Sequence, residues 1–234
     1  MIGGGDSRAQ RVAHAIRTPL TSMRALSEVL RRRLSTEDVA SHEILERIDV
    51  QIDALAEVAY DLTDASLLED GGQIRLAMKH IDLVEVVTTA IDRSAKHAHR
   101  NRCAIELQRD VDQASTMGDA ARLTEVVLHL LENALKFMPS GGVVRVFVGR
   151  EGPDTVISVD DQGIGMDPND LERAGEPYFR SKNAPSESFA GIGLGLWLSK
   201  SIIESHGGRM TVTSELALGT RVVLHLPERP QERE

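Results

Sequence analysis

Apolar residues in the first third of the chain recur every three or four positions. This spacing places them on one face of an α-helix. A polar break at 35–38 separates two such runs. Their apolar positions are Val12, Ile16, Leu20, Met23, Leu26, Leu30 and Leu34, then Ile44, Ile48, Ile52, Leu55, Val58 and Leu62. The pattern predicts two long helices in an antiparallel hairpin, with Thr36 as a candidate cap of the second helix.

An antiparallel hairpin of this kind leaves one apolar stripe uncovered when it stands alone. Two identical hairpins cover both stripes if they associate into a four-helix bundle, so the pattern favours a symmetric homodimer. Packing of the stripe against the remainder of the chain is an alternative that the pattern leaves open.

Gly71 and Gly72 are expected to end the second helix and to mark a domain boundary. Beyond them, predicted strands alternate with predicted helices. The strands are expected at 73–78, 103–108, 143–149, 155–160, 209–214 and 220–226, and the helices at 83–99, 120–137 and 194–206. The predicted class is therefore α plus α/β. It has a helical hairpin at 1–72, an α/β sandwich at 73–228 with helices on one face of a mixed sheet, and a solvated tail at 229–234.

A histidine precedes a proline by just over one turn in the first predicted helix. His14 lies off the apolar stripe, so its ring is expected to face solvent, with Thr18 one turn later on the same side. Pro19 cannot donate a backbone hydrogen bond and crowds the carbonyl of Ala15, so a bend is expected beside His14. A neutral imidazole nitrogen is a competent nucleophile towards a phosphoryl group. Without the proline, this histidine fits an ordinary surface residue equally well.

Four segments of the second half carry groups suited to a nucleotide. In the first, Asn133 offers an oxygen for Mg²⁺ and Lys136 offers a cation for phosphate. In the second, Asp161 follows a predicted strand and can accept a hydrogen bond from the amino group of adenine. Gly163 and Gly165 then allow the backbone to approach the adenine ring closely.

The other two segments are expected near the phosphates. A second glycine cluster opens the last predicted helix, and its members are Gly191, Gly193 and Gly195. The N-terminal N–H groups of that helix can bind phosphate oxygens. Between the two glycine clusters, residues 166–190 form a long polar stretch typical of a lid, from which Arg180 and Lys182 can reach the phosphates. Taken singly, each segment is also consistent with a solvated helix face, a turn or a loop.

The order and spacing of these features resemble the catalytic core of sensor histidine kinases of two-component systems, over roughly residues 8–228. The stretch from His14 to Leu20 resembles their phosphoacceptor motif, and the four later segments resemble the nucleotide boxes of the GHKL ATPase superfamily. The resemblance implies ATP and Mg²⁺ as cofactors and a homodimer. It also implies transfer of the γ-phosphoryl group to His14 and then to an aspartate of a response regulator receiver domain.

The resemblance also implies roles for individual residues. In the phosphoacceptor motif Arg17 accompanies His14, and Thr18 corresponds to the residue that positions water when such a kinase dephosphorylates its regulator. Asp161 is expected to bind adenine, and Asn133 and His129 to occupy the metal positions. The other expected nucleotide contacts are Lys136, Phe137, Gly163, Gly165, Tyr178, Arg180, Lys182, Gly191, Gly193, Leu194, Gly195, Leu196 and Thr220.

Three positions depart from the pattern of the family. Ala15 stands where Glu or Asp orients the imidazole and takes its proton, and loss of such help costs about 10²–10⁴ in rate. This predicts a weak autokinase with the balance tilted towards phosphatase activity. His129 stands where Asn is usual; because imidazole is a poor Mg²⁺ ligand, it is expected to reach the metal through a bound water. Gly175 replaces the first Phe of the lid motif.

Composition excludes several other classes. The formal net charge of −9 argues against nucleic-acid binding. No apolar run reaches the roughly 18 residues that span a bilayer, so a cytoplasmic location is expected, with any membrane anchor of a parent protein outside this sequence. Cys103 is the only cysteine, which excludes an internal disulfide. The alternatives left open are an ATP-binding pseudokinase that acts as a scaffold, a phosphatase-biased regulator, and a GHKL ATPase or serine kinase.

Overall fold

The computed structural model describes residues 8–34, 38–181 and 192–228. The chain divides into two compact units, residues 1–73 and residues 74–234, and each unit is described by itself.

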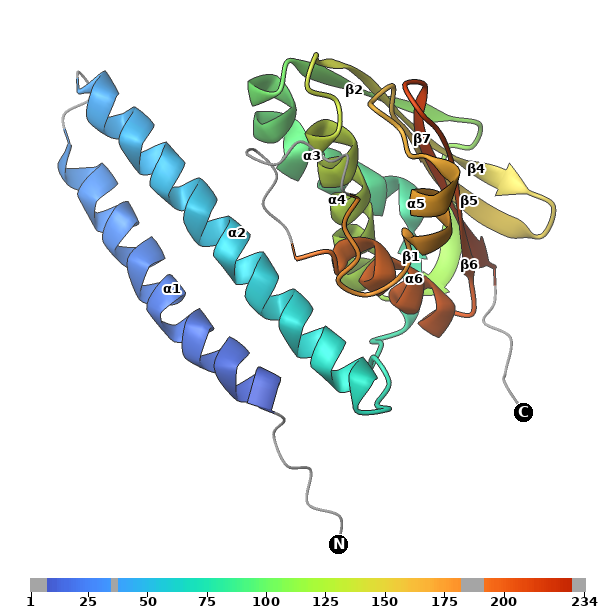
Figure 1. The fold of residues 1–234 in the computed structure, drawn as a ribbon, viewed down its shortest axis with the longest axis horizontal. Helices are drawn as coiled ribbons and strands as arrows, with labels where there is room; N and C mark the ends of the chain where they lie inside the picture. The colour runs from blue at the N-terminus through green and yellow to red at the C-terminus, as the bar shows by residue number, and fades with distance from the viewer. Residues whose placement is uncertain (1–7, 35–37, 182–191, 229–234) are drawn as a thin grey trace, which may run out of the picture. The chain divides into compact units, whose positions relative to one another are not determined.

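The first unit is a hairpin of two long helices. α1 comprises Arg8–Arg33 and α2 comprises Val39–Glu69, and they lie antiparallel and side by side (Figure 1). Leu20 of α1 and Ile52 of α2 are buried, as the periodicity predicts. Leu45 is buried as well, although the predicted stripe contained its neighbour Ile44, which is exposed. An ion pair between Arg31 and Asp49 links the helices near the turn. The predicted hairpin is therefore confirmed.

The ends of α2 are defined by local hydrogen bonds. Asp38 is the N-cap, and its side chain accepts a hydrogen bond from the backbone N–H of Ser41 at 3.1 Å. The prediction of Thr36 as the cap was wrong: the helix begins after Asp38, and Thr36 itself lies outside the described residues. At the other end, Gly71 adopts a φ of +74°, a conformation that favours glycine and stops the helix.

The second unit is built on a five-stranded sheet with the order β2-β4-β5-β7-β6. Its strands are β2 (Cys103–Arg109), β4 (Gly142–Glu151), β5 (Asp154–Asp160), β6 (Arg209–Glu215) and β7 (Gly219–Pro227). β2 is parallel to β4, and the other neighbours are antiparallel. The sheet is mixed, as predicted.

Three helices cover one face of this sheet (Figure 1). They are α3 (Leu83–Arg100), α4 (Ala120–Lys136) and α6 (Gly195–Ser205). Leu131 of α4 and Leu198 of α6 are fully buried, as is Ile157 of the central strand. Together the two units confirm the predicted fold class of a helical hairpin followed by an α/β sandwich.

The strand predicted at 73–78 was wrong. The chain forms β1 at Lys79–Asp82, which pairs with β3 (Ser115–Gly118) in a separate two-stranded sheet. The backbone N–H of Ala77 instead donates to the carboxylate of Asp119 at 2.8 Å, so this part of the chain is bound by a side chain and not by a strand. β1, β3 and the short helix α5 (Pro168–Arg173) were not predicted.

A buried histidine fixes the start of α4. Nε2 of His206 accepts a hydrogen bond from the backbone N–H of Asp119 at 3.0 Å, and Nδ1 lies 2.8 Å from the carbonyl oxygen of Ile202. These two contacts require a neutral ring with its proton on Nδ1. Burial lowers the pKa of His206, which favours that neutral form. Because Asp119 is the N-cap of α4, this contact positions the helix that carries Asn133.

Candidate nucleotide-binding site

Asp161 directly follows β5 and joins the loop after it to the start of β7. Its Oδ1 accepts hydrogen bonds from the backbone N–H groups of Gly163 at 2.8 Å and Thr220 at 3.2 Å. Its own backbone N–H donates to the carbonyl oxygen of Thr220 at 2.9 Å. Burial raises the pKa of the carboxyl group, although both backbone donors oppose that rise. The carboxyl group is thus held in one orientation, in a partly desolvated position at the C-terminal end of the central strand.

The loop after Asp161 has no room for a side chain at either of its two glycines, Gly163 and Gly165. A Cβ added at Gly163 would lie 2.3 Å from the carbonyl oxygen of Phe137, the residue after α4. Gly165 has a φ of +63°, and a Cβ there would lie 1.9 Å from the carbonyl oxygen of Glu215. Ile164 between them donates its N–H to the same Phe137 carbonyl at 3.0 Å. The two glycines therefore let this loop lie against both the end of α4 and the end of β6.

Ser214 is a member of this site that the sequence did not reveal. Its Oγ donates to the carbonyl oxygen of Gly219 and accepts from the N–H of Met166, both at 2.9 Å. It also lies 2.9 Å from Oγ1 of Thr220. In the sequence Ser214 is one of several polar residues in a predicted strand, and nothing in its position there indicates a binding role. Only the pairing of β6 with β7 brings it beside Thr220.

His129 of α4 lies beside the start of α6. His129 and Asn133 are one turn apart on α4. A Cβ added at Gly195, the first residue of α6, would lie 3.5 Å from the His129 ring, so the imidazole lies against that helix start. At the end of α4, the Lys136 ammonium lies 5.3 Å from the centre of the Phe137 ring.

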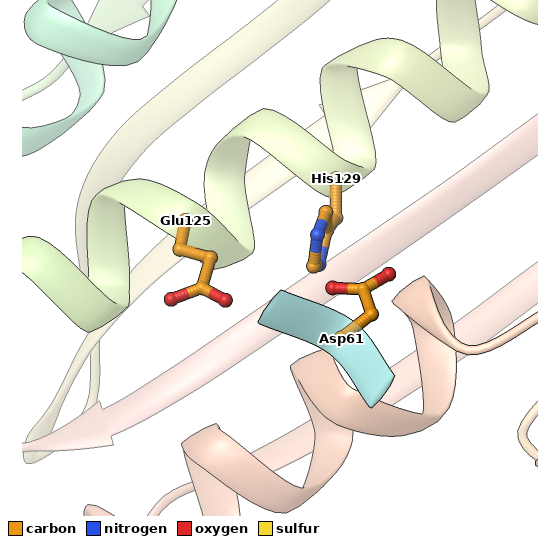
Figure 2. A group of neighbouring side chains, drawn as sticks. All are labelled: Asp61, Glu125 and His129. Carbon is orange, nitrogen blue, oxygen red and sulfur yellow. The ribbon is translucent and has the colours of Figure 1, made fainter. Parts of the chain in front are cut away.

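Glu125 is a second residue that the sequence pattern did not single out. It precedes His129 by one turn, and Figure 2 shows both side chains projecting from the same side of α4. Asp61, also labelled there, belongs to α2 of the other unit. The spacing of Glu125 and His129 was visible in the sequence, but its significance depends on the position of α6 beside the imidazole.

α6 begins at the second glycine cluster. Gly193 has a φ of +77°, and a Cβ there would lie 2.6 Å from the carbonyl oxygen of Phe179. Leu194, which is buried, is the N-cap of α6 and makes no side-chain capping hydrogen bond. The first N–H groups of α6 are therefore not capped by their own N-cap side chain, which suits an anion. Leu196 follows in the first turn of this helix.

The segment predicted as a lid is described only in part. It contains α5, and Arg173 of that helix stacks 4.4 Å from the centre of the Phe179 ring. Tyr178 has a φ of +61° and is half exposed, and Arg180 is exposed. Lys182 and Gly191 lie outside the described residues.

The predicted phosphoacceptor residues lie in the other unit. His14, Arg17 and Thr18 are in α1, and Pro19 lies inside the helix with an exposed side chain. The side chains of the first three are not among those described. None of the helices within the described ranges has both the length and the apolar character needed to cross a membrane.

The fold and the site define a nucleotide-binding α/β sandwich joined to a helical hairpin. Residues 118–230 match the family described as histidine kinase-, DNA gyrase B-, and HSP90-like ATPase, and residues 9–71 match the His Kinase A (phospho-acceptor) domain. The chain belongs to the sensor histidine kinases of two-component systems.

Individual relatives agree with this assignment. The signal transduction histidine-protein kinase/phosphatase MprB of Mycobacterium avium is 35% identical over 227 residues, covering 93% of this chain and 42% of MprB. The solved mycobacterial sensor histidine kinase MprB is 34% identical, with a TM-score of 0.55, and the match covers 65% of this chain and all of that structure. Full-length ShkA, solved with AMPPNP, has a TM-score of 0.68 at 22% identity, over 94% of this chain and 45% of ShkA, which shows the shared fold. The chain spans 36–52% of the length of the first curated relatives it matches.

Because the backbone around Gly165 is tightly packed, a methyl group added at this position should strongly lower the free energy of unfolding. Gly165→Ala should lower the free energy of unfolding by more than about 2 kcal/mol, because it combines a positive φ with a clash against the Glu215 carbonyl. Chemical denaturation measures this loss.

Gly152→Ala is the matched control for that substitution. Gly152 has a φ of +61° but no atom within 4 Å of an added Cβ, so only the backbone cost of about 1 kcal/mol is expected. Equal losses for the two variants would contradict the tight packing at Gly165.

Proposed function

We propose that this protein is an ATP-dependent protein-histidine kinase. It phosphorylates His14, passes the phosphoryl group to an aspartate of a response regulator receiver domain, and acts in the cytoplasm, where ATP is available. The observation that carries the proposal is that one chain contains both a candidate phosphoacceptor helix and a candidate nucleotide site. A helix contains His14 just ahead of Thr18 and Pro19. A separate unit contains both the Asp161 carboxyl group, which two backbone N–H groups hold, and the start of α6, whose N-cap side chain makes no capping hydrogen bond.

Asp161 is assigned to adenine. Both of its hydrogen bonds from the backbone end on Oδ1. Oδ2 then accepts a hydrogen bond from the adenine amino group, and Thr220 supports the carboxyl group from behind. Gly163 and Gly165 are assigned to the same adenine position, because they hold the loop beside Asp161 against the end of α4 and the end of β6, where neither position has room for a Cβ. The complex of ShkA with AMPPNP supports nucleotide binding by this fold.

The phosphates are assigned to the start of α6. Its first N–H groups point along the helix axis and carry the positive end of the helix dipole, which favours phosphate oxygens. Cationic side chains at Lys136, Arg180 and Lys182 are assigned to the same phosphates. The other residues assigned to the nucleotide are Phe137, Tyr178, Gly191, Gly193, Leu194, Gly195 and Leu196.

The metal positions fit Mg²⁺ only in part. Asn133 offers an amide oxygen, which suits this ion, but His129 offers a ring nitrogen, which Mg²⁺ binds poorly. No catalytic step is therefore assigned to Mg²⁺.

Phosphoryl transfer to His14 is a substitution at the γ-phosphorus of ATP. A ring nitrogen of His14 forms a bond to the phosphorus while the bond to the β–γ bridging oxygen breaks, and ADP leaves with that electron pair. The imidazolium then loses a proton. Ala15 has no group to take it, so the proton passes to water, at a cost of about 10²–10⁴ in rate relative to a carboxylate.

A homodimer is proposed because the hairpin exposes apolar side chains along both helices. The exposed fractions run from 40% for Ile48 to 68% for Leu26. The members of this surface are Met23, Leu26, Val29, Leu30, Val39, Ile44, Ile48 and Leu55. Two copies that pair these faces form a four-helix bundle and remove the apolar surface from water.

A second candidate function is favoured by Ala15 together with Thr18. A chain that lacks the proton acceptor but keeps the residue assigned to water positioning fits a phosphatase-biased regulator. A pseudokinase that binds ATP and holds the regulator without catalysis is the limiting case.

Incubation with γ-labelled ATP and Mg²⁺ or Mn²⁺ tests the proposed kinase activity. The chain is expected to acquire label that is labile in acid and stable in alkali, and His14→Ala should remove all of it. His42→Ala is the control, because His42 lies in α2 of the same hairpin. Label that persists in the His14→Ala variant would sink the assignment. Absence of label with intact ATP binding would favour the phosphatase-biased regulator.

Asp161→Asn should separate nucleotide binding from stability. The amide oxygen can still accept the bonds from Gly163 and Thr220, and the variant avoids burying a charge, so the free energy of unfolding at neutral pH should stay the same or rise. ATP affinity, measured by calorimetry, should fall by about tenfold or more, because the amide NH2 group then faces the adenine amino group and cannot accept its hydrogen bond. Unchanged affinity would contradict the assignment of adenine to Asp161.

A further inference from the structure

The pair formed by Glu125 and His129 has the chemistry of a metal ligand set. Both project from one side of α4, one turn apart (Figure 2). A carboxylate oxygen of Glu125 and a ring nitrogen of His129 lie within 4.8 Å of each other. Two ligands of one ion, with bonds of about 2.1 Å, lie roughly 3–4 Å apart, so at most a small side-chain rotation is needed for both to bind the same ion.

Arg122 contacts the carboxylate of Glu125 through one of its oxygens. Its guanidinium donates to Oε2 of Glu125 at 3.0 Å. A carboxylate has two oxygens and about four acceptor positions. Arg122 can therefore orient Glu125 while an ion binds the same group, as hydrogen bonds behind a metal ligand commonly do.

The pair lies next to the position assigned to the phosphates. The His129 ring is against Gly195, the first residue of α6, and Asn133 follows His129 by one turn on α4. An ion between Glu125 and His129 is therefore close to the helix start at which the phosphate oxygens are placed. Those oxygens can complete its coordination.

The ligand types select the ion. Mg²⁺ prefers oxygen in strict octahedral geometry and binds nitrogen poorly. A carboxylate with an imidazole suits first-row transition metals, whose affinity for such sites rises from Mn²⁺ towards Cu²⁺. The imidazole is thus a poor fit to Mg²⁺ and a good fit to Mn²⁺ and its neighbours.

We propose that the ion accompanying the nucleotide in this protein is a first-row transition-metal ion, represented by Mn²⁺, bound directly by His129 and Glu125. The inference rests on the proposed nucleotide site, which it deepens by naming the metal. It replaces the expectation that His129 reaches the metal only through water.

Nucleotide affinity in the two metals is the first test. Calorimetry with AMPPNP should give binding about tenfold or more tighter in Mn²⁺ than in Mg²⁺, since loss of a hydrogen-bonding partner behind a metal ligand already costs about 10–100-fold in affinity. His129→Asn should bring the two affinities to within about threefold, because an amide oxygen suits both ions. An equal preference for Mn²⁺ in the wild-type chain and in His129→Asn would overturn the proposal.

Pulsed electron spin resonance of bound Mn²⁺ tests the ligand itself. Coupling to ¹⁴N is expected in the wild-type chain, should change when the histidines carry ¹⁵N, and should vanish in His129→Asn. Glu125→Gln should weaken Mn²⁺ binding, whereas Glu85→Gln on α3 should not. Bound Mn²⁺ without histidine coupling would contradict direct ligation.

The same spectra, recorded with Mn²⁺ alone, separate this inference from the proposed function. If AMPPNP binds with neither ion, the proposed function fails. Histidine coupling with Mn²⁺ alone would then still support the metal ligands, and its absence would overturn them.

Discussion

The fixed position of the Asp161 carboxyl group is the constraint on which the site depends. One of its oxygens accepts hydrogen bonds from Gly163 in the loop that follows and from Thr220 in β7, so the end of β5, the first glycine cluster and the start of β7 cannot move independently. The glycines at 163 and 165 are consequences of this arrangement, because the loop lies directly against backbone carbonyls. Partial desolvation of this carboxyl group lowers the free energy of unfolding. Such a loss is expected where the group serves to bind a polar ligand.

The helices are positioned by a second polar contact on the opposite side of the unit. His206 at the end of α6 accepts the N–H of Asp119, and Asp119 caps α4. One contact therefore couples the two helices that carry the proposed phosphate and metal ligands. The end of the central strand therefore provides the position assigned to adenine, and the helices provide the positions assigned to phosphate and metal.

Long periodic segments were predictable from the sequence because their signal is repeated over many residues. The hairpin, the helices at α3, α4 and α6, and the strands of the five-stranded sheet all belong to this group. The two-stranded sheet was not predictable, since β1 and β3 have only four residues each and their pairing joins segments more than thirty residues apart. The cap of α2 was misplaced because Thr36 and Asp38 carry similar signals in one polar stretch.

The candidate site was predictable where several residues stand in a recognisable order and spacing. Asp161 and the glycines fall in this class: each fits a turn or a loop when taken singly, but their order along the chain resembles the nucleotide boxes of the family. Ser214 and Glu125 do not, because their significance comes from neighbours in space: Thr220 across a strand pair, and the start of α6 beside His129. Ala15 and His129 occupy the positions assigned to the proton acceptor and to the metal, so these two departures from the family pattern are expected to change the chemistry and not the fold.

The initial rate of acid-labile labelling in Ala15→Glu, compared with Ala15→Gln, tests the central claim most directly. If the chain is a histidine kinase slowed by the missing proton acceptor, Glu should raise the rate by about 10²–10⁴. Gln, which can orient the imidazole but cannot take its proton, should give a much smaller gain. No gain with Glu, at unchanged ATP affinity, would contradict the kinase assignment and identify the chain as a regulator that binds nucleotide without transferring its phosphoryl group.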